Sequence, residues 1–151
     1  MKEHILNIIA LPAGRVIKVG NSYLLTQDRI EDIATRLQHV MADQRPYLKF
    51  GYSIRDLAND IHVPAYQLSA YLNRQVGLNF NDFLNQFRVR YCEDLIKSGV
   101  DDQLNLKGLA FKCGFSNRNT LTTAFKKFTG FTPSCYSRPR VRTMDMGGKV
   151  A

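Results

Sequence analysis

Residues 109–133 read LAFKCGFSNRNTLTTAFKKFTGFTP, and they look like a second copy of residues 57–80, which read LANDIHVPAYQLSAYLNRQVGLNF. Both copies begin with Leu-Ala, pass through a short break and continue into an amphipathic run that stops at a glycine, Gly77 or Gly130. The first halves of the copies align at an offset of 52 residues and the second halves at an offset of 53. A sequence unit that occurs twice in a short chain predicts a structural unit that occurs twice in its fold.

Each copy predicts a short helix, a tight turn and a second helix. The turn residues are 62–64 in the first copy and 114–116 in the second. Pro64 suits the first turn of a helix, where a missing backbone N–H costs nothing, and Gly77 and Gly130 suit the left-handed residue that ends a helix. This is the layout of a helix-turn-helix, whose second helix enters the major groove of DNA.

Further helices are predicted on either side of the first copy. The apolar residues of 28–42 recur every three or four positions, which indicates an amphipathic helix. Residues 53–56 read Ser-x-x-Asp, a capping-box-like start for the first short helix. Asn79 can cap a longer helix over residues 80–98, whose phenylalanine-rich stripe is expected to pack into both copies. A last short helix should begin at Pro133.

The sequence therefore predicts an all-α fold: a seven-helix bundle of two helix-turn-helix subdomains joined by a long central helix, with a short irregular or β-like N-terminal segment. The N-terminal part is set apart by its many β-branched residues, broken by proline and glycine. We expect residues 1–27 to be a linker or the remnant of an upstream domain, residues 28–138 to form the double helix-turn-helix domain, and residues 139–151 to be a basic disordered tail.

The composition favours a globular protein with an anionic partner. Hydrophobic residues make up 44 % and charged residues 23 % of the chain, and the formal net charge is +8. A positive excess of this kind points to nucleic acid or, less often, to an acidic membrane surface. The apolar run ILNIIAL near the start has seven residues, far fewer than a membrane span needs.

Neither a metal site nor an active site is predicted. Cys92, Cys113 and Cys135 form no C-x-x-C pair and have no histidine at ligand spacing, so no metal and no cofactor are expected. Buried, reduced thiols of a cytoplasmic protein are the expected alternative. The sequence also lacks paired catalytic carboxylates and a glycine-rich phosphate loop, so we do not expect an enzyme.

A helical wheel of the second copy separates a core face from an outward face. The core face carries Leu121, Ala124, Phe125 and Phe128, and the outward face carries Asn119, Thr120, Thr123 and Lys127. Amide, hydroxyl and ammonium groups can all donate to base edges or phosphates, and Arg118 and Lys126 flank this face and suit phosphates. The alternative interpretation is a plain solvated face.

The second helix of the first copy is less distinctive. Leu68 and Leu72 face inward, whereas the outward face carries Tyr66, Ser69, Ala70 and Asn73, with Arg74 to one side. Tyr66 can pack on sugar or on a thymine methyl, and Asn73 can bond a phosphate or an adenine. Because Ser69 and Ala70 offer little, we expect this helix to position the protein more than it reads sequence.

Two stretches carry a resemblance to a known family. GFSNRNTLTTAFKKFTGFTPSCY (residues 114–136) and LSAYLNRQVGLNFNDFLNQFRV (residues 68–89) resemble the DNA-binding domain of AraC/XylS-type transcription regulators, the latter in the variant common in Bacteroidetes. The resemblance implies two recognition helices in successive major grooves. It also implies base-reading positions, which fall here on Tyr66, Ser69, Ala70, Arg118, Asn119, Thr120 and Thr123.

The leading hypothesis is a sequence-specific, double-stranded DNA-binding transcription regulator of the bacterial cytoplasm, located at the nucleoid. The helix over 80–98 would span about 28 Å, and recognition helices at its two ends could reach adjacent major grooves about 34 Å apart. We expect a monomer, with dimerisation possible through an absent domain, and RNA polymerase as a further partner if the protein is an activator. The alternative is a helical protein–protein interaction module.

Overall fold

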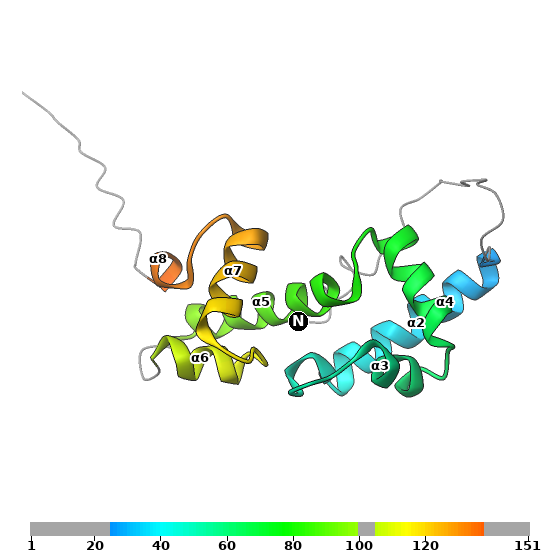
Figure 1. Cartoon of the computed structure of the whole chain (residues 1–151), viewed down its shortest axis with the longest axis horizontal. Helices are drawn as coiled ribbons and strands as arrows, with labels where there is room; N and C mark the ends of the chain where they lie inside the picture. Colours follow the sequence, from blue (N-terminus) through cyan, green and yellow to red (C-terminus); the bar gives the residue numbers. More distant parts are fainter. Residues whose placement is uncertain (1–24, 100–104, 138–151) are drawn as a thin grey trace, which may run out of the picture.

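The computed structural model describes residues 25–99 and 105–137, and all regular elements in these residues are helical. For this part of the chain the prediction of an all-α fold with seven α-helices is confirmed (Figure 1). Most of the expected β-like N-terminal segment, residues 1–24, and the whole of the expected basic tail, residues 139–151, lie outside the described residues. The elements, including a 3₁₀ turn (η1) and a π-helical turn (η2), are in chain order α2 (Gln27–Asp43), η1 (Pro46–Leu48), α3 (Ile54–Asp60), α4 (Ala65–Tyr71), η2 (Leu72–Val76), α5 (Phe80–Lys97), α6 (Leu106–Lys112), α7 (Arg118–Thr129) and α8 (Pro133–Ser137).

Polar side chains determine where several helices begin. The Ser53 hydroxyl accepts a hydrogen bond from the backbone N–H of Asp56, and the Asp56 carboxylate accepts one from the backbone N–H of Ser53, which completes the predicted capping box of α3. Asn79, Asn105 and Asn117 cap α5, α6 and α7, each accepting from the backbone N–H three residues further on. The central helix and both helices of the second copy therefore start where a side chain satisfies their first N–H groups.

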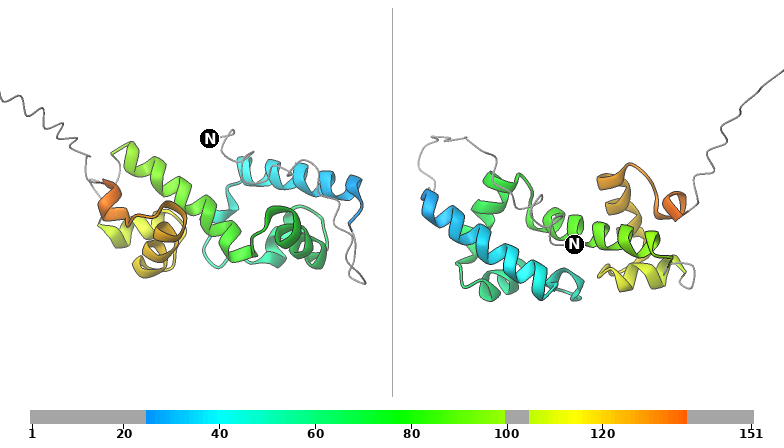
Figure 2. Two further views of the ribbon diagram at one scale, coloured as in Figure 1. Left: turned by 90° about the horizontal axis from the view of Figure 1, so that it is seen from above. Right: turned by 180° about the vertical axis from the view of Figure 1, so that it is seen from behind.

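The long helix α5 runs between the two helix-turn-helix units (Figure 2) and carries an apolar face toward each of their cores. Phe83 and Phe87 in its first half pack into the core shared with α2, α3 and α4. Val89, Cys92 and Ile96 pack into a second core shared with α6 and α7. The expectation that the phenylalanine-rich stripe packs into both copies is confirmed, because its phenylalanines serve the first core and its later members Tyr91 and Leu95 pack against the second. The sequence did not indicate the second apolar face, whose smaller side chains are buried in the second core.

The two copies of the repeat share the same turn in three dimensions. In the first copy the backbone N–H of Val63 donates to the carbonyl oxygen of Ala58 over 2.9 Å, and in the second Phe115 donates to Ala110 over the same distance. The preceding residue is left-handed in both turns, with φ of 54° at His62 and 80° at Gly114. The internal repeat read from the sequence is thus a repeat of backbone conformation.

Arg88 of α5 joins the two units at their junction. Its Nε donates a hydrogen bond of 2.7 Å to the carbonyl oxygen of Tyr47 in η1, and its guanidinium lies over the ring of Phe115, 5.6 Å from the centroid. Burial lowers the pKa of Arg88, because a desolvated cation loses the stabilisation that water gives its charge. The Arg88 side chain therefore contacts Tyr47 of the first unit and the buried Phe115 in the turn of the second unit.

The three cysteines do not share one environment. Cys92 and Cys113 are completely buried in the second core, whereas Cys135 on the short helix α8 is exposed. The expectation of three buried thiols is therefore wrong for Cys135. Its neighbour Tyr136 is half-buried against the second core, where its ring meets that of Phe125 edge to face.

Candidate nucleic-acid interface

The second helix of the second copy, α7, has the two faces that the sequence predicts. Leu121, Ala124 and Phe125 are buried against the second core, and Phe128 is half-buried beside them. The predicted polar residues are all exposed: Arg118, Asn119, Thr120, Thr123, Lys126 and Lys127. A strip of amide, hydroxyl and cationic side chains therefore faces away from the core along the whole helix.

The start of α7 is held in place by its own cap. The side-chain oxygen of Asn117 accepts hydrogen bonds from the backbone N–H of Thr120 over 2.9 Å and from its hydroxyl over 3.1 Å. The Thr120 side chain is thereby oriented before any ligand arrives. The side chains of Arg118 and Lys126 form no ion pair within the described residues, so both cations are available to an anionic partner.

The second helix of the first copy, α4, offers a weaker polar face, in line with its sequence. Tyr66 is 54 % exposed, Ser69 and Ala70 are half-buried, and Asn73 and Arg74 are exposed. The Asn73 side-chain amide donates to the backbone oxygen of Ser69 over 2.9 Å, so part of its hydrogen-bonding capacity is used within the helix.

The end of this recognition helix widens. Residues Leu72–Val76 form the π-helical turn η2, and Gly77 ends it in the left-handed conformation with φ of 76°. On the core side Tyr71 is fully buried, which raises its pKa to about 12 and keeps it neutral. Asn73 and Arg74 lie on this widened turn, so their positions differ from those of a regular α-helix.

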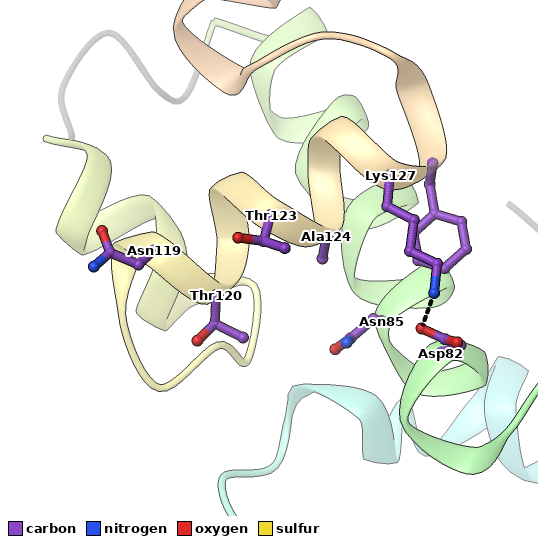
Figure 3. A pocket seen from close by; sticks show the side chains of 8 residues that line it. Asp82, Asn85, Asn119, Thr120, Thr123, Ala124 and Lys127 are labelled. Carbon is purple, nitrogen blue, oxygen red and sulfur yellow. Dashed lines mark hydrogen bonds and ion pairs between the residues drawn. The ribbon is translucent and has the colours of Figure 1, made fainter.

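A polar groove runs between α7 and the first turns of α5 (Figure 3). It has a volume of about 410 Å³. Its lining includes two residues of α5 that the sequence pattern did not indicate, Asp82 and Asn85, together with Asn119, Thr120, Thr123, Ala124, Lys127 and Phe128 of α7. No local pattern could have identified Asp82 and Asn85, because they join the site only through the crossing of two helices distant in sequence.

An ion pair closes one end of this groove. Lys127 Nζ lies 2.7 Å from Asp82 Oδ1 and donates a hydrogen bond to it. The other carboxylate oxygen, Oδ2, accepts a hydrogen bond of 2.9 Å from the Asn79 side-chain amide. Lys127 therefore lies on the outward face as predicted, but its ammonium already has an anionic partner.

Both second helices of the repeat run crosswise to α5, α4 beyond its start and α7 across its body (Figure 1). The contact between Lys127 and Asp82 places the C-terminal half of α7 beside the first turn of α5. The expectation that the recognition helices pack at the two ends of the central helix is thus wrong for α7, which lies across the body of α5 and reaches its first turn through Lys127.

Other kinds of site are not supported by the described part of the chain. No group of three or more His, Cys, Asp or Glu side chains there is arranged to hold a metal ion. Among the same residues, no helix combines the length and the apolar character required to cross a membrane. The polar strip of α7 and its groove are therefore the leading candidate site.

Comparison with known proteins supports the same assignment of fold. The family described as "Helix-turn-helix domain" matches residues 57–139, more than half of the chain. The HTH-type transcriptional activator RhaR of Escherichia coli strain K12 is 23 % identical over 123 residues, which are 80 % of this chain. The match covers only 43 % of RhaR, so the chain spans less than half the length of the curated relatives it matches.

Two solved structures share the arrangement of helices. A protein of unknown function from Listeria innocua is 32 % identical with a TM-score of 0.54, over 67 % of this chain and 93 % of that one. The C-terminal domain of AraT, a response regulator from Geobacillus stearothermophilus, is 21 % identical with a TM-score of 0.59, over 78 % of this chain and 93 % of that one. With its repeated helix-turn-helix unit and this family match, the chain belongs to the AraC-type helix-turn-helix family.

Proposed function

We propose that this protein is a sequence-specific, double-stranded DNA-binding transcription regulator, with residues 28–138 as its DNA-binding domain. The observation that carries the proposal is the repeated turn, which leaves one face of each following helix exposed and polar. A net charge of +8 supplies the sequence-independent attraction to phosphates that DNA-binding proteins use. Family membership and a relative described as a transcriptional activator support the same function.

The two recognition helices have different roles in this proposal. α7 reads bases, because Asn119, Thr120 and Thr123 expose amide and hydroxyl groups that can bond base edges. Arg118 and Lys126 hold the flanking phosphates. α4 mainly positions the protein: Tyr66 packs on sugar or a thymine methyl, Asn73 and Arg74 bond the backbone, and the half-buried Ser69 and Ala70 let the helix approach closely.

A single chain inserts both helices into adjacent major grooves on one side of the DNA. The 18 residues of α5 amount to about 27 Å, which is less than the roughly 34 Å of one DNA turn. Because α7 lies across the body of α5 rather than at its end, α5 does not separate the helices by its full length. We therefore propose that the DNA bends toward the protein so that both helices can enter.

The remaining features follow from this function. The protein acts as a monomer through the described domain, and segments beyond it could add dimerisation. If it is an activator, as the description of RhaR would suggest, RNA polymerase is a further partner. Its place of action would be the bacterial cytoplasm, at the nucleoid.

Selection of bound sequences from a random double-stranded DNA pool tests the proposal. A sequence-specific regulator should enrich one asymmetric motif of nearly two helical turns, and its affinity should fall steeply with salt as counterions return to the DNA. Without an enriched motif and a salt-dependent affinity, a helical protein–protein interaction module would be the better description.

A further inference from the structure

Asp82 is a fixed negative charge within a surface proposed to meet a polyanion. Both of its carboxylate oxygens have partners, Oδ1 in the Lys127 ammonium and Oδ2 in the Asn79 amide. The side chain of Asp82 is only 22 % exposed, whereas that of Lys127 is 54 % exposed. The carboxylate is therefore the anchored member of the pair and the ammonium is the movable one.

The position of the pair gives it significance for DNA binding. Asp82 lines the same groove as Asn119, Thr120 and Thr123, and Figure 3 shows the Lys127 side chain reaching along the groove wall toward it. An unpaired carboxylate there would repel approaching phosphates, and an unpaired lysine would attract them on DNA of any sequence. As a pair, the two groups contribute almost no net charge to the interface.

The pair has little to do with stability. Ion pairs this exposed contribute little to the free energy of unfolding, since water screens them and a long side chain loses rotamer freedom. The main effect of the pair is to fix the position of the Lys127 ammonium. A DNA phosphate that bound the Lys127 ammonium would have to replace its 2.7 Å contact with the anchored carboxylate of Asp82. The net gain in binding free energy from this exchange is therefore small.

We infer that Asp82 is a positioning residue that keeps Lys127 away from the phosphate backbone and thereby lowers the affinity of the protein for DNA of random sequence. This inference rests on the proposed DNA-binding function. It assigns Lys127 to the groove rather than to the phosphate-binding cations, a role that falls to Arg118 and Lys126. The consequence is a weaker electrostatic contribution to non-specific binding than the number of cations on α7 would give.

The salt dependence of binding to a random-sequence duplex tests the inference. Replacing Asp82 by Asn frees Lys127, so the slope of log affinity against log salt should become steeper by about 0.9, the value for one additional phosphate contact. Affinity at low salt should rise accordingly. Adding Lys127→Met to Asp82→Asn removes the freed ammonium, and the slope of the double variant should return to that of the unmodified protein.

Asp56→Asn is the matched control. Asp56 occupies the same third position of a capped helix as Asp82, and its replacement changes the net charge by the same amount. Within residues 25–99 and 105–137, however, Asp56 has no ammonium partner at salt-bridge distance. The control should leave the salt slope close to that of the unmodified protein. Circular dichroism and thermal melting should establish that each variant is folded.

The inference is overturned if Asp82→Asn leaves the salt slope unchanged, or if Asp56→Asn steepens the slope equally. It is also overturned if the salt slope of the double variant is shallower than that of the unmodified protein by about 0.9. The last result would mean that Lys127 bonds a phosphate in the native complex. If the Asp82 variants do not fold, the inference is tested on the unmodified protein by NMR, through the ¹⁵N resonance of the Lys127 ammonium. It should keep its position when random-sequence DNA is added, and a shift to a phosphate-paired value contradicts the inference. Failure of the unmodified protein to bind any duplex would instead refute the proposed function.

Discussion

Gly114, in the turn of the second helix-turn-helix, lies directly against the carbonyl oxygen of Tyr47 in the first unit. A Cβ atom at Gly114 would come within 2.5 Å of that oxygen and within 3.0 Å of the Cα of Leu48. The equivalent residue in the first copy is His62, which carries a full, exposed side chain at a similar left-handed φ. The glycine is therefore required in the second turn by the close approach of the two units as well as by φ.

This contact predicts that Gly114→Ala is more destabilising than a backbone conformation alone would explain. A non-glycine residue in the left-handed region costs about 1–3 kcal/mol, and the overlap with Tyr47 adds to it. Gly77→Ala is the matched control, because Gly77 has nearly the same φ of 76° and open space around its Cβ position. Urea denaturation should show a clearly larger loss of unfolding free energy for Gly114→Ala. Equal losses would mean that the units do not press against each other there.

Arg88→Met should weaken the junction while keeping most of the apolar stem of the side chain. The change removes the hydrogen bond to the Tyr47 carbonyl and the contact with the Phe115 ring, and hydrogen bonds from charged groups contribute about 1.5–3 kcal/mol. We expect a loss of that order in the unfolding free energy. Arg55→Met on the exposed side of α3 is the control and should change it by less than about 0.5 kcal/mol. A loss no greater than that of the control would show that Arg88 does not tie the units together.

Phe125→Ala tests how much the buried face of α7 contributes to stability. Phe125 is completely buried and meets Tyr136 edge to face with ring centroids 5.4 Å apart. Removing a buried phenylalanine side chain costs about 3–5 kcal/mol. Phe111→Ala, at a position that is 51 % exposed on α6, should cost far less. Thermal unfolding followed by circular dichroism compares the two, and similar melting temperatures would contradict the assigned core.

The division of roles on α7 predicts two kinds of DNA-binding defect. Asn119→Ala and Thr123→Ala should change which bases are preferred, at a cost of about 1–3 kcal/mol for the favoured sequence if a good contact is lost. Lys126→Met should instead weaken binding to all sequences and make the salt slope shallower by about 0.9. Affinity measured on the selected site and on single-base variants separates these effects. A uniform loss for all three substitutions would contradict the assignment of reading residues.

Much of this architecture could be predicted because it depends on local sequence. The outward face of α7 follows from a 3.6-residue period, and the capping box of Ser53 and Asp56 lies within four consecutive residues. The second apolar face of α5, with Val89, Cys92 and Ile96, could not be predicted in the same way, because only the phenylalanine-rich face stands out in the sequence.

The polar contacts between distant segments could not be predicted. Lys127 and Asp82 are 45 residues apart, and Arg88 and Tyr47 are 41 apart. Each pair meets because two elements distant in sequence pack in a particular orientation, which depends on whole packed faces rather than on any short pattern. The wheel therefore places Lys127 on the correct face of α7, but only the fold reveals that its ammonium is already paired.

Hydroxyl-radical footprinting of the monomeric protein on its selected site tests most directly the claim that one chain fills two adjacent major grooves. The account predicts two protected segments on one face of the duplex, and an insertion of five base pairs between them should turn one segment to the opposite face and abolish its protection. Unchanged protection of both segments after the insertion, or protection that appears only with a symmetric two-chain complex, would contradict it.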